Sequence, residues 1–159
     1  MTMNLYTISD ITTSSERYKL YILMSNHDKL SENITFIQSQ NIPVINIGLE
    51  LARYIYSLEN FRYLNIEAYE YTKKLLEDTK SKIGNTGIDV IAIYNLGILQ
   101  EPMLEINTVQ LLKEFSKSSA LIIIWENLFD THQLNWPTQK NKFFLDFHET
   151  QLKELQYAI

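Results

Sequence analysis

Short apolar runs alternate along the chain with longer stretches in which apolar residues recur about every 3.6 positions. The runs are rich in β-branched residues and are bounded by polar turns, as is typical of strands covered on both faces of a sheet. Four of them predict parallel strands: Lys19–Met24, Pro43–Ile47, Ile88–Tyr94 and Ala120–Trp125. A weaker run, Lys142–Phe147, predicts a fifth strand near the end of the chain.

The stretches between these runs predict crossover helices. Apolar residues share one helical face in three of them: Leu30, Ile34 and Ile37; Leu49, Ala52, Ile55 and Tyr56; Ile106, Val109, Leu112 and Phe115. A longer helix is predicted over residues 66 to 83, where acids precede lysines by three or four positions. Gly84 and Gly87 predict its end. A last amphipathic segment has helical spacing at Leu152, Leu155 and Ile159.

This alternation predicts the α/β class, with a parallel sheet, right-handed crossovers and helices on both faces. The chain has 159 residues, of which 45% are apolar. That is enough for one hydrophobic core, so we expect a single domain over residues 1–159.

Composition narrows the classes of function. The net charge is −5, and broad phosphate-neutralising surfaces need clustered Lys and Arg, so we do not expect direct nucleic-acid binding. The chain has no cysteine, which excludes disulfides and thiolate chemistry. It has no apolar run of membrane-spanning length, and its first ten residues lack the features of a secretory signal. We therefore expect a cytoplasmic protein without a membrane segment.

In a parallel α/β sheet, ligands bind beyond the carboxyl ends of the strands, here first at the loop over residues 25–32. A phosphate-binding loop has the spacing G-x-x-x-x-G-K-[ST]. At those four positions this chain has Ser25, Leu30, Ser31 and Glu32, and Lys29 lies two positions too early. Ser25 and Asp28 instead fit a helix-capping box, which favours a plain helix N-terminus.

The metal-binding position at the end of a later strand is also altered. An Asp is expected there to hold magnesium, and the chain has Tyr94, a neutral phenol. The sequence therefore lacks both halves of a standard magnesium–nucleotide site, and we expect neither a bound cofactor nor a metal.

Two segments carry a resemblance to a known family. The first is Asn46-Ile47-Gly48-Leu49-Glu50-Leu51-Ala52-Arg53. The second is Tyr94-Asn95-Leu96-Gly97-Ile98-Leu99 with the Glu101-Pro102 turn. A helix centred on Leu111-Leu112 and a strand that ends in Trp125 follow in the same order. Over about residues 18–147, the chain resembles the small P-loop component (BrxF type) of bacteriophage-exclusion (BREX) systems, with degenerate Walker A and Walker B motifs.

The resemblance implies a three-layer, P-loop NTPase-like sheet of about five strands. It also implies a subunit that interacts with other proteins of a phage-defence complex. The altered residues of the nucleotide site predict that this subunit is non-catalytic, and oligomer formation stays open. The alternative is a divergent ATP-binding or ATP-hydrolysing enzyme that uses magnesium. Its nucleotide-binding residues would be Ser25, His27, Lys29, Ser31 and Glu126.

Four residues are candidates for a protein interface: Arg53, Trp136, Phe143 and Phe144. Arg53 also fits a surface ion pair with Glu50, and core packing explains Phe143 equally well. Two Asp-x-His units, at residues 130–132 and 146–148, fit either weak metal sites or solvent-facing polar pairs. The tyrosine-rich segment over residues 54–71 predicts an insertion over the sheet.

Overall fold

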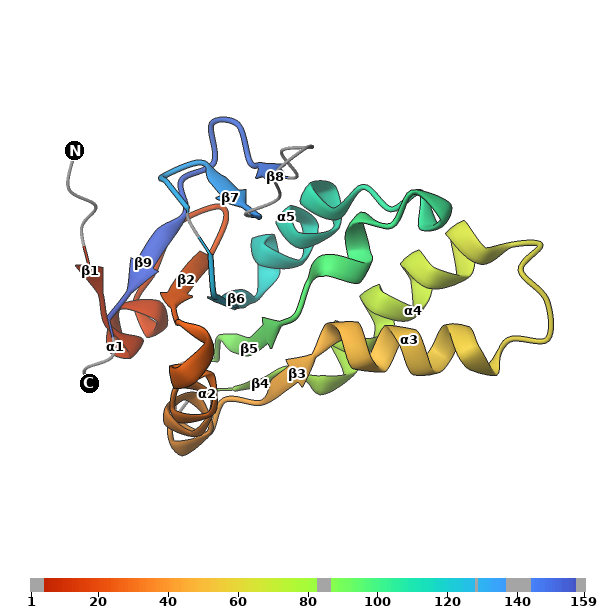
Figure 1. Cartoon of the computed structure of the whole chain (residues 1–159). Coiled ribbons are helices and arrows are strands. Elements are labelled where there is room, and N and C mark those ends of the chain that lie inside the picture. Colours follow the sequence, from red (N-terminus) through yellow and green to blue (C-terminus); the bar gives the residue numbers. More distant parts are fainter. Residues whose placement is uncertain (1–4, 83–86, 128, 137–143, 157–159) are drawn as a thin grey trace.

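A central, mostly parallel sheet organises the protein (Figure 1). The structure, a computed structural model, describes residues 5–82, 87–127, 129–136 and 144–156. The order across the sheet is β1 (Leu5–Tyr6), β9 (Lys153–Leu155), β2 (Leu20–Met24), β6 (Ala120–Trp125), β5 (Asp89–Tyr94) and β3 (Val44–Asn46). All of these neighbours pair in parallel. A short strand, β4 (Ser81–Lys82), pairs antiparallel with the start of β5.

Helices cover both faces of this sheet. Two cover one face: α1 (Ile8–Thr12) and α2 (Leu30–Ser39). Three cover the other: α3 (Ile47–Ser57), α4 (Leu64–Thr79) and α5 (Thr108–Ser118). The structure therefore confirms the predicted α/β class, with a mostly parallel sheet and helices on both faces.

Alternation along the central strands divides the core into two apolar layers. In β2, Leu20 and Ile22 face the layer under α3, α4 and α5, whereas Tyr21 and Leu23 face the layer under α1 and α2. All six residues of β6 are buried. Burial of a large apolar side chain contributes about 1.5–3 kcal/mol, so these strands supply much of the stability of the fold.

The end of the chain differs from its sequence pattern. Leu152 and Leu155 have helical spacing, but the segment forms β9, which lies between β1 and β2 in the sheet. Both leucines are buried, Leu152 in one core layer and Leu155 in the other. Strand pairing on both sides decides the conformation here, and a spacing of three cannot distinguish a one-turn helix from a three-residue strand. Ile159 lies outside the described residues.

The predicted fifth strand also differs from the prediction. Its described part, β8 (Phe144–Asp146), pairs antiparallel with β7 (Gln133–Asn135) in a separate two-stranded sheet. Residues 142 and 143 lie outside the described part of the chain. Leu134 and Leu145 pack into the layer under α5, so this small sheet extends the core instead of widening the central sheet.

Helix α3 buries a different face from the one its apolar pattern predicts. Ile47 and Leu51 are buried, whereas Leu49 is 42% exposed and Tyr56 is 92% exposed. Helix α4 runs over Leu64–Thr79, so the predicted helix over residues 66 to 83 ends before β4. Together α3 and α4 form an arm that extends to one side of the sheet, away from β1 (Figure 1).

No helix in the described residues is long and apolar enough to span a membrane.

Strand β9 carries a buried ammonium group. Lys153 is only 4% exposed. Its Nζ donates to the carbonyl oxygen of Tyr18 at 3.3 Å and lies 5.6 Å from the centre of the Tyr21 ring. Burial lowers the pKa of Lys153, because removal from water disfavours the charged amine.

We predict that, near pH 7, the free energy of unfolding of Lys153→Met equals that of the wild type or exceeds it by up to about 1 kcal/mol. The substitution keeps the apolar stem of the side chain and removes a buried charge. The folded-state pKa lies below the unfolded value, so the unfolded chain binds more protons. Below the folded-state pKa of Lys153, the wild type therefore bears the full free-energy cost of burying a charged amine. This cost decreases as the pH rises toward the pKa of the unfolded chain.

The advantage of the variant should thus shrink between about pH 7 and about pH 10 in urea denaturation. Lys73→Met, which removes the charge of an exposed lysine on α4, is the control for the loss of one positive charge. A Lys153→Met protein that is clearly less stable than the wild type near pH 7 would contradict the prediction.

Candidate functional site

The carboxyl ends of β2 and β6 define the candidate site. The chain leaves β2 toward α2 on one face of the sheet and leaves β6 toward β7 and β8 on the opposite face. Where neighbouring parallel strands send their connections to opposite faces, a crevice forms in which α/β proteins bind ligands. Ser25 after β2 and Glu126 after β6 lie at this edge.

The loop after β2 is closed by its own hydrogen bonds. A short 3-10 helix, η1 (His27–Lys29), follows β2, and Asn26 caps it: the Asn26 Oδ1 accepts from the backbone N–H of Lys29 at 2.9 Å. The prediction that Ser25 and Asp28 form the capping box is wrong. The Ser25 hydroxyl donates instead to the carbonyl oxygen of Asn26 at 2.8 Å.

A phosphate-binding loop needs backbone N–H groups that point freely into one concavity. Here the N–H of Ser25 donates to the carbonyl oxygen of Trp125 at 2.8 Å, and that of Leu30 donates to His27. The N–H of Lys29 is held by Asn26. The protein thus uses these three donors itself, before a ligand arrives.

Acidic side chains outnumber basic ones around the loop. His27 Nδ1 lies 3.5 Å from Glu126 Oε2, and Lys29 Nζ lies 3.4 Å from Glu32 Oε2. Asp28 adds a third carboxylate to the same short segment. Lys29 is therefore already paired, and a polyphosphate would meet three carboxylates, which repel it. A hollow of about 490 Å³ beside the loop has Lys29 and Glu32 in its wall.

Ser31 lies at the exposed start of α2 and belongs to a different hollow, with Thr35 and Ser39. The structure thus brings His27 next to Glu126 and Lys29 next to Glu32, and it places Ser31 in the second hollow, which shares Glu32 with the first.

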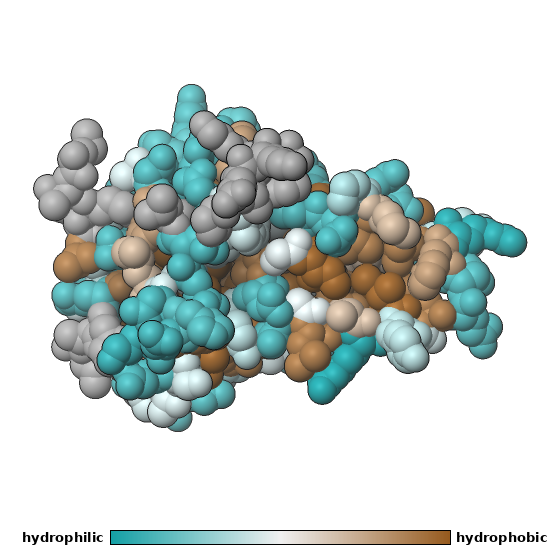
Figure 2. All heavy atoms as spheres, viewed as in Figure 1, coloured by the Kyte–Doolittle hydropathy of each residue, from teal (hydrophilic) through white to brown (hydrophobic). Residues whose placement is uncertain are grey.

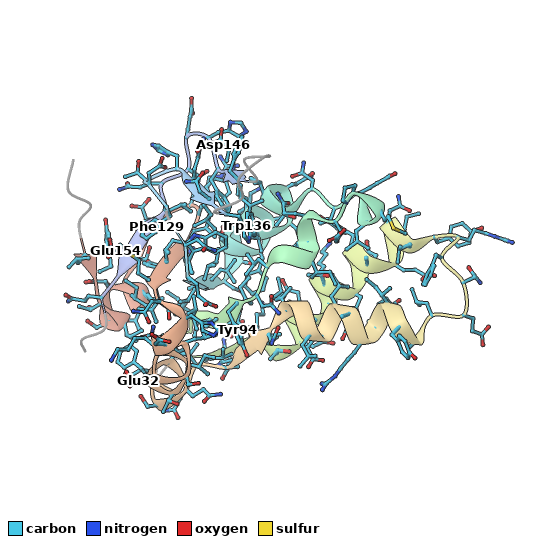
Figure 3. All side chains as sticks on the ribbon, viewed as in Figure 1. Glu32, Tyr94, Phe129, Trp136, Asp146 and Glu154 are labelled. Carbon is cyan, nitrogen blue, oxygen red and sulfur yellow. The ribbon has the colours of Figure 1, made fainter. Side chains whose placement is uncertain are left out.

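Tyr94 lies at the end of β5, where a metal-binding Asp is expected. Figure 3 shows it well apart from Glu32, which comes from α2. Among the residues that the structure describes, no three His, Cys, Asp or Glu side chains gather in a way that could hold a metal ion.

A polar lock joins the two segments that carry the family resemblance. Asn46 Oδ1 accepts from Asn95 Nδ2 at 2.8 Å and from the backbone N–H of Leu49 at 2.9 Å, so one side chain both caps α3 and ties it to the loop after β5. Asn95 has a φ of 62°, a conformation that Asn tolerates better than most residues.

Gly48 makes this lock possible. A Cβ there would lie 2.7 Å from Asn95 Cγ and 2.8 Å from its carbonyl oxygen. Sequence reasoning missed this role. Its signal is an Asn followed two positions later by Gly at a strand-to-helix junction, which fits an N-cap with close backbone approach.

The two Asp-x-His units form turns. Asp130 Oδ1 accepts from the backbone N–H of His132 at 2.8 Å, and Asp146 Oδ1 accepts from that of His148 at 2.8 Å. In Figure 3, Asp146 lies far from Glu32, on the small two-stranded sheet. Both aspartates therefore hold the chain at its bends, and these contacts give the units a structural role.

The interface candidates lie in two regions. Arg53 is exposed on α3, with Nη1 3.4 Å from Glu50 Oε1. Trp136 is half-buried and packs edge-on against Trp125, with ring centres 4.8 Å apart. Phe144 is 45% exposed on β8, and Phe143 lies outside the described residues.

Comparison with known protein families, curated proteins and solved structures finds no match to this chain.

We predict that Gly48→Ala destabilises the fold by about 1–3 kcal/mol, because the added methyl group overlaps Asn95 and breaks the lock. Gly97→Ala is the matched control. Gly97 is exposed and a Cβ there meets nothing within 4 Å, so its effect should stay within about 0.5 kcal/mol. Urea denaturation of both variants measures the difference. Equal stabilities for the two would show that the lock does not constrain the fold.

Proposed function

We propose that this chain is a non-catalytic subunit with a P-loop-like fold, which acts by protein–protein interaction within a bacterial phage-defence complex of the BREX type. The observation that carries the non-catalytic part is the closed loop after β2. Its donors at Ser25 and Lys29 are bonded within the protein, and its one lysine side chain is paired with Glu32.

The polar lock supports the family part of the proposal. The two segments that resemble the BREX component are far apart in the sequence, but they meet at the Asn46–Asn95 hydrogen bond and at Gly48. Because the two segments pack against each other, a substitution in one would disturb the other. This contact is a physical reason for both segments to occur in the same chain.

A second candidate is a divergent ATP-binding or ATP-hydrolysing enzyme. The observation that favours it is the His27–Glu126 pair at the carboxyl edge of the sheet, 3.5 Å apart. A carboxylate and an imidazole are groups that general acid–base catalysis uses, and here they lie close to each other.

We predict no binding of ATP with magnesium by calorimetry, that is, a Kd weaker than about 1 mM. The reason is that the loop and the neighbouring Glu126 present three carboxylates to a phosphate, and the one lysine of the loop is paired with Glu32. ATP with EDTA in place of magnesium is the control for a weak metal contribution. Micromolar binding would overturn the non-catalytic proposal, and ATP hydrolysis that vanished in His27→Gln and Glu126→Gln would favour the enzyme.

The role in defence is tested by plaque counts. Deletion of the coding sequence in its host should raise the plaque counts of a restricted phage to those of an undefended strain. Reintroduction of either the wild-type chain or Lys29→Ala should restore protection, since Lys29 only pairs with Glu32 on the surface. Counts that are unchanged by deletion contradict the defence role, and failure of Lys29→Ala alone contradicts the non-catalytic one.

A further inference from the structure

Basic side chains gather at the edge of the sheet opposite the loop after β2. The segment before β2 and the end of α5 meet there. The backbone N–H of Lys19 donates to the carbonyl oxygen of Ser116 at 2.9 Å, and Lys19 Nζ donates to that of Lys117 at 3.3 Å. These hydrogen bonds hold the two segments together, so that Arg17 and Lys19 come from one side of the contact and Lys113 and Lys117 from the other.

Three of these charges surround one tyrosine ring. The centre of the half-buried Tyr18 ring lies 4.8 Å from Lys113 Nζ and 5.3 Å from Arg17 Cζ. Lys117 Nζ lies 6.0 Å from the same point. Each cation is attracted to the aromatic ring, but the three cations also repel one another because they are so close together. We call Arg17, Lys19, Lys113 and Lys117 the basic patch.

Carboxylates compensate only part of this charge. Lys117 Nζ lies 3.0 Å from Glu114 Oε1. Within the described part of the chain, Arg17 and Lys113 form no ion pair and contact the Tyr18 ring instead. Residues 13–19 and 113–119 together contain four basic and two acidic side chains, whereas the whole chain has 14 basic and 19 acidic ones. The patch is therefore positive on a protein whose net charge is negative.

The end of α5 explains two of the four cations. Carbonyl groups at the end of a helix carry partial negative charge, which stabilises Lys19 and Lys117 there. Lys113 lies more than one turn before this end, and Arg17 contacts the Tyr18 ring. The structure of the helix end thus leaves Arg17 and Lys113 unexplained.

A patch of this kind needs an anionic partner. Figure 2 shows the other kind of surface on this protein, with apolar atoms gathered over the arm. Beside the cations, Ser15 and Ser118 are exposed in the same two segments. Proteins contact the phosphates of nucleic acids through Arg and Lys together with Ser, Thr and Tyr hydroxyls and backbone N–H groups. A nucleic-acid strand also carries its charges densely, so it can neutralise several cations of one patch.

We propose that the basic patch binds the phosphate backbone of a nucleic acid, without preference for base sequence. Cations already lie against the Tyr18 ring, so the ring is not available to stack on a base. The net charge of the whole chain predicts no such binding, but folding gathers four of its 14 basic residues at one edge of the sheet. Since the patch is small, the Kd should be about 10–100 µM at about 20 mM salt.

Fluorescence polarisation of a labelled oligo-dT with the full chain measures this binding. A plot of log K against log salt should have a slope of about −3, because each of four phosphate contacts on a single strand contributes about −0.7. Oligo-dA and RNA of the same length should bind within about threefold of oligo-dT, and duplex DNA should give a slope of about −3.6. A tenfold preference for one base would contradict contact through phosphate alone.

The variant Arg17→Gln with Lys113→Gln removes the two cations that have no ion pair. It should weaken binding at least about tenfold and make the slope shallower by about 1.4. Lys29→Gln with Arg62→Gln is the matched control, because it removes the same charges at exposed sites outside the patch. Its slope should equal that of the wild type. Arg17→Lys with Lys113→Arg keeps both charges and should bind like the wild type.

Polyglutamate of equal charge tests the competing class of partner. If it displaces oligo-dT at an equal or lower concentration, the patch takes an acidic polypeptide and the proposal is wrong. Absence of oligo-dT binding at low salt, or an equal loss in both Gln double variants, also overturns it. The titrations contain no ATP, magnesium, phage or other protein. A negative result therefore leaves the proposed non-catalytic role open, and failure of that role leaves the binding of nucleic acid unaffected.

Discussion

The pairing of β2 with β6 is the constraint on which the rest of the structure depends. Their register runs from Leu20 opposite Leu121 to Met24 opposite Trp125. A slip of one residue would exchange the side chains that face the two core layers, so the register is strongly specified wherever both faces are covered. This pairing also sets Ser25 beside Trp125 and His27 within reach of Glu126.

From that centre, the polar lock at Asn46, Gly48 and Asn95 sets the direction of the arm. Strand β3 ends at Asn46 and α3 begins at Ile47, with no loop between them. A helix that follows its strand without a loop takes its direction from the junction. Two hydrogen bonds to Asn46 Oδ1 hold this junction, and Gly48 leaves the space that Asn95 occupies. The lock therefore couples the core to the arm.

The carboxyl edge and the arm are consequently different kinds of surface. At the edge, polar groups pair with one another: Asn26 with Lys29, Lys29 with Glu32, and His27 with Glu126. On the arm, Leu49 and Tyr56 are apolar and exposed. Covering exposed apolar surface lowers the free energy, whereas polar groups that are already paired gain little stability from a new partner. A partner would therefore gain more from covering the arm than from covering the carboxyl edge.

The sequence by itself determined four of the parallel strands, the crossover helices and the sheet with helices on both faces. Continuous β-branched runs such as Ala120–Trp125 and periodic helices such as α5 carry strong local signals. It also determined that the loop after β2 lacks the glycines of a phosphate site and has no lysine at the required position. Only the tertiary structure decided which polar group caps that loop. Ser25 and Asn26 are both good caps, but the backbone N–H of Ser25 is paired with Trp125 of β6, and Asn26 caps the 3-10 helix that follows. Tertiary pairing likewise made Leu152–Leu155 a strand segment and turned Leu49 and Tyr56 outward, because α3 has apolar residues on both faces and only its neighbours select the face that is buried.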